Sequence, residues 1–173
     1  MNEYIKLAKN SIKNYIKTGQ RMKVPENLPE HFYSEKKGVF ITIYEMNPKK
    51  KLRGCVGTFL PTRDCIAEEI IDNAISAATY DNRFEAIRGN ELKNLQYEVS
   101  LLNTSEQIAS IHDLDVKKFG VIVKSKDGRT GLLLPDLEGV KMPEHQISIA
   151  CQKAGINLEN EEIELYRFTI MKY

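Results

Sequence analysis

The chain has 173 residues, which suffices for one ordinary domain or for two small lobes that share a core. Its 25 Lys and Arg residues balance 24 Asp and Glu residues, so the net charge is +1. This balance argues against a protein that binds nucleic acid or an anionic membrane over its whole surface, and we expect no nucleic-acid partner. Hydrophobic residues make up 42% of the chain, which is typical of a globular protein, and we expect a single domain over residues 1–173.

The cysteines, Cys55, Cys65 and Cys151, are odd in number and far apart, so they form neither a disulfide framework nor a CxxC metal pair. We interpret them as free thiols in a reducing compartment. Residues 1–6 lack the apolar run of a signal peptide, and the apolar stretches are much shorter than the roughly 20 residues of a membrane-spanning helix. We therefore expect a cytoplasmic protein that does not insert into membranes.

The first part of the chain predicts one helix and two strands. Apolar residues at a 3.6-residue period predict a helix over residues 5–16, which the next glycine can end in a left-handed cap. The prolines of residues 24–29 predict an irregular connection. A β-branched and aromatic run predicts a strand over residues 38–44, followed by a turn at 47–51 and a second strand over 52–60. Two glycines inside the second strand indicate a bulge, a tight bend or a close approach by another element.

The middle of the chain predicts two helices and a strand. Residues 66–78 carry an inner stripe of isoleucines and small alanines, which favours a helix that packs closely on a sheet or on another helix. A short helix is expected over residues 90–95 and a strand over 97–102. In that strand Glu98 and Ser100 share one face, which we interpret as a solvated face rather than as the place of a general base.

The last part of the chain predicts a hairpin, a helix and a strand. Asp-Gly between residues 120–124 and 131–134 favours a tight hairpin because it accepts a positive φ. Residues 143–154 begin with proline and are followed by glycine, as a helix often does, and residues 163–170 alternate like a strand. Strands joined by hairpins and interrupted by helices predict an antiparallel or mixed sheet, so the fold class is α+β.

The turn Arg53-Gly54-Cys55-Val56-Gly57 is the best candidate site. Two glycines bracket a thiol, and Arg53 can favour the thiolate if its guanidinium points the same way. Backbone N–H groups at a glycine bend can also form an anion-binding nest. The alternative is a buried cysteine that acts as a small hydrophobic residue, with the glycines serving a bulge, and the residues alone favour that alternative.

Arg83 is the second candidate, because its forked guanidinium can bind a carboxylate or a phosphate. The alternative is that Arg83 pairs with Asp81 or Glu85 and fixes its own loop, which is the commoner role for such an arginine. The three histidines show no metal-ligand spacing, and we expect no metal and no cofactor. No nucleotide-binding loop or Ser-His-Asp order indicates a conventional enzyme class.

The stretch LRGCVGTF at residues 52–59 closely resembles the LRGCIGTF signature of the AMMECR1 family. Other segments resemble that family in the same order. They are GVFIT at 38–42, AATYDNRF at 77–84, YEVSLL at 97–102, GVIV at 120–123, RTGLLLP at 129–135 and CQKAG at 151–155. The likeness covers nearly all of the chain from about residue 38 onward.

The resemblance implies an α+β fold in which an antiparallel sheet flanked by helices is joined to a second, smaller antiparallel β lobe across a cleft. The biochemical function of the family is not established. Bacterial and archaeal members resemble protein A of the AmmeMemoRadiSam system, which implies Memo-like and radical SAM proteins as partners. Two hypotheses follow: a partner-binding or accessory protein, and an enzyme that uses Cys55 as a nucleophilic or redox thiol. The candidate binding residues are Arg53, Gly54, Gly57, Thr58 and Arg83.

Overall fold

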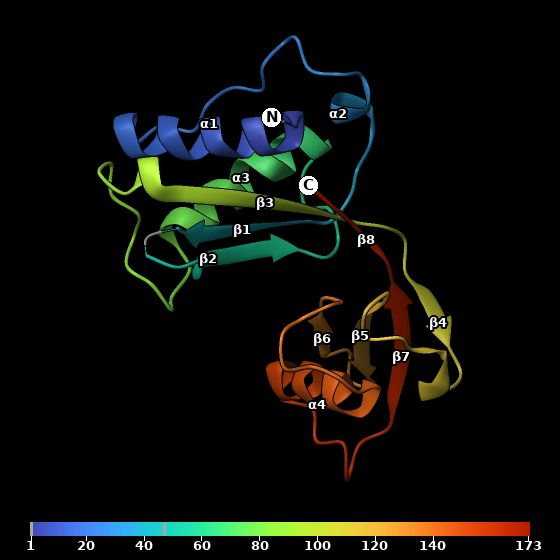
Figure 1. The fold of residues 1–173 in the computed structure, drawn as a ribbon. Coiled ribbons are helices and arrows are strands. Elements are labelled where there is room, and N and C mark those ends of the chain that lie inside the picture. Colours follow the sequence, from blue (N-terminus) through green and yellow to red (C-terminus); the bar gives the residue numbers. More distant parts are fainter. Residues whose placement is uncertain (1, 47) are drawn as a thin grey trace. The chain divides into compact units, whose positions relative to one another are not determined.

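Two four-stranded antiparallel sheets organise the chain, as the computed structural model of residues 2–46 and 48–173 shows (Figure 1). The chain divides into two units: unit 1 holds residues 1–101 and 172–173, and unit 2 holds residues 102–171. The fold class is α+β, as the sequence predicts. Met1 and Asn47 lie outside the described residues, so the turn predicted at 47–51 is seen only from Pro48, where residues 48 and 49 bend before the second strand. Within the described residues, the helices are too short or too polar to cross a membrane.

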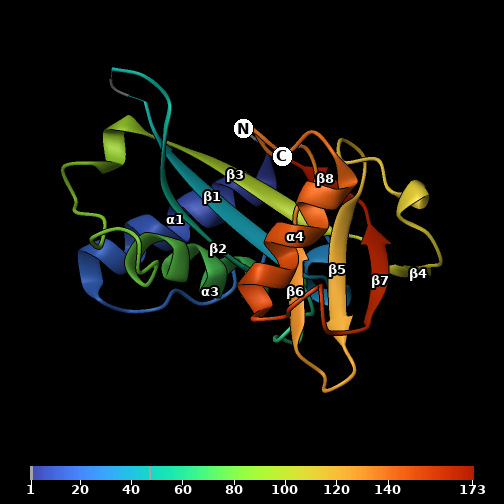
Figure 2. The same ribbon diagram turned by 90° about the horizontal axis from the view of Figure 1, so that it is seen from below.

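Unit 1 combines helices with a sheet of strand order β2-β1-β3-β8. Its elements, in chain order, are α1 (Glu3–Thr18), α2 (His31–Ser34), β1 (Val39–Glu45), β2 (Lys51–Thr58), α3 (Ile66–Thr79), the 3₁₀ helix η1 (Leu92–Asn94) and β3 (Leu95–Leu102). The fourth strand of the sheet, β8 (Ile170–Lys172), begins in the residues of unit 2 and ends in those of unit 1. Helix α1 packs against α3, and α3 packs against β1 and β2 (Figures 1 and 2). Asn2 caps the start of α1, and Gly19 ends it with a φ of 68°, which confirms the predicted left-handed cap.

The sheet of unit 1 has two chemically different faces because side chains alternate along each strand. Val39, Ile41 and Ile43 of β1 are fully buried, as is Val99 of β3 directly opposite Ile41. The opposite face carries polar residues, among them Thr42 of β1 and Glu98 of β3. We call this second face the thiol face; it is defined by Thr42, Tyr44, Cys55 and Glu98.

Ser100 corrects one expectation about β3. The sequence predicts a solvated face for Glu98 and Ser100, but Ser100 is only 1% exposed. Glu98 is half-buried, with 25% of its side chain exposed. Alternation of polar and apolar residues identifies the two faces of a strand, but it does not show how far each face is covered.

Unit 2 contains a sheet of strand order β4-β7-β5-β6 and one long helix. Its elements are β4 (Glu106–Ile108), the 3₁₀ helix η2 (Ile111–Asp113), β5 (Gly120–Ser125), β6 (Thr130–Leu133), α4 (Pro143–Ala154) and β7 (Ile163–Phe168). Helix α4 packs on β5 and β6 (Figure 2), with Ile147, Ala150 and Cys151 buried in the core. The predicted β5–β6 hairpin is confirmed, and Gly128 adopts the positive φ of 90° that its turn requires.

The prediction of a single strand over residues 163–170 is wrong. It is two strands, β7 and β8, which join different sheets. Residue Thr169 separates them, and its carbonyl and hydroxyl both accept hydrogen bonds from Asn103, the residue that follows β3. A continuous alternating pattern cannot report such a change, because each half of the pattern is consistent with a strand.

Candidate functional site

A β-bulge in β2 sets the position of the cysteine turn. Ile43 of β1 lies opposite Gly54, whereas the next residue, Tyr44, lies opposite Leu52, so Arg53 is the extra residue of the bulge. The shift in register places Cys55 directly opposite Thr42. Residues that are directly opposite in an antiparallel pair project from the same face, so the thiol lies on the thiol face of the sheet.

Both glycines of the turn allow a close approach by other parts of unit 1. A Cβ at Gly54 would lie 2.2 Å from the carbonyl oxygen of Ala77 in α3. A Cβ at Gly57 would lie 2.4 Å from the Phe40 ring and 2.4 Å from the carbonyl oxygen of Val39. Such separations are far below van der Waals contact, so glycine lets α3 and β1 pack directly against β2. Of the explanations that the sequence offers for these glycines, the structure shows both a bulge and a close approach.

The backbone of Cys55 is held on its outer side by the loop that follows α3. Because β2 is the edge strand of its sheet, Cys55 has no neighbouring strand there. Its N–H donates to Oδ2 of Asp81 at 2.8 Å, and its carbonyl accepts from Nη2 of Arg83 at 3.3 Å. The loop therefore supplies one acceptor and one donor in place of a strand, which closes the edge at this point.

Asp81 and Arg83 form the pair that makes this closure rigid. Nε and Nη2 of Arg83 donate to the two oxygens of Asp81 at 3.0 and 2.8 Å. The Asp81 side chain is 5% exposed and the Arg83 side chain 53% exposed. Hydrogen bonds from Arg83 are the main cause that lowers the pKa of Asp81 to about 2. Arg83 thus makes the loop-fixing contact that the sequence offers as the alternative to ligand binding.

Arg53 is also engaged within unit 1. Its Nε and Nη2 donate to the carboxylate of Glu91 at 2.8 and 3.2 Å, and its Nη1 donates to the carbonyl of Glu85 at 2.9 Å. Only 14% of the Arg53 side chain is exposed. Burial favours the neutral form of Glu91, but the hydrogen bonds from Arg53 and from the Arg88 backbone outweigh it and lower the Glu91 pKa. The guanidinium is thus directed to the 80–91 loop.

Thr58, at the end of β2, binds a buried carboxylate. Its hydroxyl donates to Oε1 of Glu69, which lies in the first turn of α3 and is 1% exposed. Glu69 also accepts hydrogen bonds from the backbone N–H groups of Thr62 and Arg63, both at 2.8 Å, and from the Thr62 hydroxyl at 2.9 Å. Several donors therefore satisfy a buried carboxylate that has no cationic partner among the described residues. This arrangement joins β2 to the start of α3.

The thiol of Cys55 lies beside polar side chains of two neighbouring strands. Its Sγ is 3.4 Å from Oγ1 of Thr42, and Glu98 lies opposite Thr42 on β3. Cys55 is half-buried, whereas Thr42 is 7% exposed. Tyr44 projects from the same face two residues further along β1. Burial is the main cause that raises the pKa of Tyr44, and the nearby Glu98 and Cys55 raise it further.

Nearly the whole chain matches one protein family. The AMMECR1 family model covers residues 5–173. The chain belongs to the AMMECR1 family. A Thermotoga maritima protein is 44% identical over 98% of this chain and 96% of its own length. The protein CA_C1420 of Clostridium acetobutylicum is 39% identical over 98% of this chain, which covers 35% of that longer protein. The crystal structure of the uncharacterized protein PH0010 from Pyrococcus horikoshii has a TM-score of 0.89 with 32% identity, covering 98% of this chain and 88% of that one.

Two residues of this AMMECR1 site were missed by sequence reasoning. Thr42 and Tyr44 lie in a run that reads as an ordinary strand, and nothing in that run distinguishes them. The signal that could have found them is their spacing: residues two apart share a face, and a hairpin to the cysteine strand brings that face to the thiol. The bulge at Arg53 determines how the residues of β2 align with the two faces of β1, and a bulge cannot be placed from the sequence of one strand alone.

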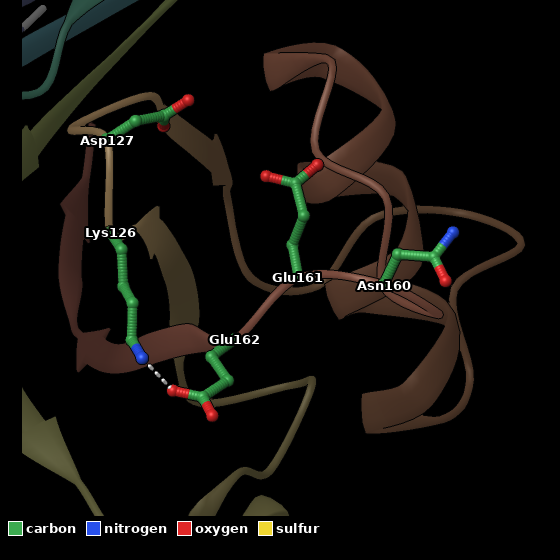
Figure 3. Close-up of a pocket in the computed structure, with 5 residues that line it drawn as sticks. All are labelled: Lys126, Asp127, Asn160, Glu161 and Glu162. Carbon is green, nitrogen blue, oxygen red and sulfur yellow. Dashed lines mark ion pairs between the residues drawn. The ribbon is translucent and has the colours of Figure 1, made fainter.

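A surface pocket of about 380 Å³ lies in unit 2, away from the cysteine turn in the sequence (Figure 3). Its lining residues are Lys126, Asp127, Asn160, Glu161 and Glu162. Figure 3 shows Lys126 paired with Glu162, and Arg129 pairs with both Asp127 and Glu161. The charges that line the pocket thus join the hairpin to the 155–162 loop. Among the described residues, no group of three or more His, Cys, Asp or Glu side chains could hold a metal ion.

Proposed function

We propose that this AMMECR1-family chain is an accessory protein that acts by binding partners, with the thiol face as part of its recognition surface. The observation that carries this proposal is that three residues of the LRGCVGTF signature contact other parts of unit 1 rather than a ligand site. Arg53 binds Glu91, Thr58 binds Glu69, and Gly54 makes room for α3. The Cys55 side chain, by contrast, is half-buried and lies on the polar thiol face.

An anion site at the cysteine turn has little support from this geometry. Such a site needs a cation or several backbone N–H groups directed at one point. The Arg53 guanidinium is directed to Glu91, and the Cys55 N–H is directed to the Asp81 carboxylate. A negatively charged carboxylate at this N–H disfavours a second anion there.

Memo-like and radical SAM proteins are the partners that we propose, on the strength of the family resemblance. The Clostridium relative supports a modular role, because the part that matches this chain is 35% of a longer protein. In that relative the domain is therefore joined to further sequence in one polypeptide. A domain that is covalently joined to others in one species can act beside separate chains in another.

The proposal is tested by mixing the purified chain with the Memo-like and the radical SAM protein of the same genome and measuring complex formation by size-exclusion chromatography. We expect a complex that Cys55→Ser retains and that Leu52→Glu weakens, because Leu52 lies opposite Tyr44 at the edge of the thiol face and is 40% exposed. Leu158→Glu is the matched control, since Leu158 is 42% exposed and lies in unit 2. Absence of a complex with either protein, or equal loss in both Leu variants, would contradict the proposal.

A second candidate function is an enzyme that uses the Cys55 thiolate as a nucleophile. One observation favours it: the thiol is half-buried, its backbone is fixed by Asp81 and Arg83, and a hydroxyl lies 3.4 Å away. The test is the rate at which iodoacetamide alkylates each cysteine of the native protein as a function of pH. Reaction of Cys55 that is much faster than that of Cys65, with a midpoint below the roughly 8.5 of a free thiol, would favour the enzyme. A Cys55 that reacts only on unfolding would exclude it.

A further inference from the structure

The thiol face carries groups that attract a positive charge. Glu98 contributes a carboxylate and Tyr44 an aromatic ring. The pKa of Tyr44 is raised chiefly by burial, and the nearby Glu98 carboxylate raises it further. These groups come from adjacent positions on neighbouring strands, so one ligand group can reach both of them.

Two ammonium groups of the protein itself already lie at this face. Nζ of Lys50 lies 4.0 Å from the centre of the Tyr44 ring. Nζ of Lys172 lies 3.8 Å from Oε1 of Glu98, a separation longer than a hydrogen bond. The Lys172 side chain is 42% exposed. Exposed pairs of this kind contribute little stability, so an incoming ammonium group can displace either lysine at small cost.

We propose that the thiol face binds the ammonium group of a lysine side chain of a partner protein, held between the Glu98 carboxylate and the Tyr44 ring. This inference rests on the proposed partner-binding function and names the group that the partner contributes. The exposed Leu52, opposite Tyr44, supplies an apolar surface for the aliphatic stem of that lysine.

The geometry favours a lysine of a protein over a free small amine. Small-molecule sites usually bury most of the ligand in an enclosed, mostly apolar cavity. The groups named here lie instead along adjacent strands of a sheet face, and Leu52 and Lys50 at its edge are exposed. A side chain presented by a partner surface needs only such a partly covered site, because the rest of the interface contributes binding.

The test is an NMR titration of the full chain with Nα-acetyl-lysine methylamide, with Nα-acetyl-norleucine methylamide as the uncharged probe. We expect the lysine probe to shift the amide signals of Tyr44 and Glu98, and the norleucine probe to shift them much less. Glu98→Gln should weaken binding of the lysine probe about two- to fivefold, which is the size of an exposed ion pair. Glu164→Gln is the matched control, because Glu164 also neighbours a tyrosine, Tyr166, but on the sheet of unit 2.

A second variant tests the inference in the opposite direction. Lys172→Met removes the internal competitor for Glu98, so it should strengthen binding of the lysine probe about two- to fivefold. Equal shifts with both probes, or unchanged binding in both Glu98→Gln and Lys172→Met, would overturn the inference. Binding of the probe without any complex in the chromatography experiment would keep this site and refute the proposed partners. A complex that forms although the lysine probe does not bind would support the proposed partners and refute the lysine site.

Discussion

The carboxylate of Asp81 accepts a hydrogen bond at 2.8 Å from the backbone N–H of Cys55, so the loop after α3 holds the strand that carries the thiol. Arg83 completes the arrangement, because it binds both the Asp81 carboxylate and the Cys55 carbonyl. An edge strand normally leaves such groups to solvent or to another chain. Here two residues of one loop, Asp81 and Arg83, fix the backbone of the residue that carries the thiol.

Replacing Asp81 should therefore destabilise unit 1. We expect Asp81→Asn to lower the free energy of unfolding by about 1–3 kcal/mol, because an amide retains an acceptor for Cys55 but loses its charge-assisted bonds to Arg83. Urea unfolding measures this change. Asp64→Asn is the control: the Asp64 side chain is 95% exposed, and its loss should cost no more than about 0.5 kcal/mol. Equal effects of the two substitutions would contradict the assigned role of Asp81.

The same pair predicts how stability depends on pH. The folded state lowers the pKa of Asp81 from 3.8 to about 2, so it favours the ionised form. The resulting stabilisation, about 2 kcal/mol, is fully present above the unfolded pKa near 3.8 and is lost as the pH falls toward 2. The difference in unfolding free energy between wild type and Asp81→Asn should thus be constant between pH 7 and 5 and shrink below pH 4. A difference that stays constant down to pH 3 would exclude Asp81 as its source.

Local rules predicted the parts of the fold that depend on a few neighbouring residues. Gly19 and Gly155 end helices with positive φ, and Gly128 serves its hairpin turn, as expected. These features follow from the conformational freedom of glycine and from residue spacing. Local structure can therefore be predicted from the sequence where one segment contains all the interacting residues.

The arrangement of the candidate site could not be predicted in the same way. The bulge at Arg53 depends on how β2 aligns with β1, and the roles of Arg53 and Thr58 depend on Glu91 and Glu69, which lie far along the chain. A single sequence shows which residues can form ion pairs but not which ones meet. The Asp81–Arg83 pair is the exception, because the two residues are close enough in sequence to be named as partners in advance.

Glu69 provides a third prediction, on the cost of changing a buried carboxylate. We expect Glu69→Gln to lower the free energy of unfolding by about 1–3 kcal/mol. The amide oxygen can replace Oε2, which accepts from the N–H groups of Thr62 and Arg63, but the –NH₂ group then faces the Thr58 and Thr62 hydroxyls that donate to Oε1, and the charge-assisted bonds are lost. Thermal unfolding followed by circular dichroism measures the loss. Glu68→Gln, at the neighbouring and partly exposed position of α3, should change stability by less than about 0.5 kcal/mol. A neutral Glu69→Gln would show that the donors can reorganise around the amide.

Gly54 gives the sharpest test of close packing between β2 and α3. A Cβ at this position would lie 2.2 Å from the carbonyl oxygen of Ala77, so Gly54→Ala must displace backbone, and we expect it to cost about 2–3 kcal/mol of unfolding free energy. Gly89→Ala is the matched control, because nothing lies within 4 Å of a Cβ there; it should be neutral or stabilise the protein by up to about 1 kcal/mol. Chemical denaturation of both variants decides the matter. If Gly54→Ala is as stable as Gly89→Ala, then α3 can move away from β2, and the glycine of the signature has a role other than packing.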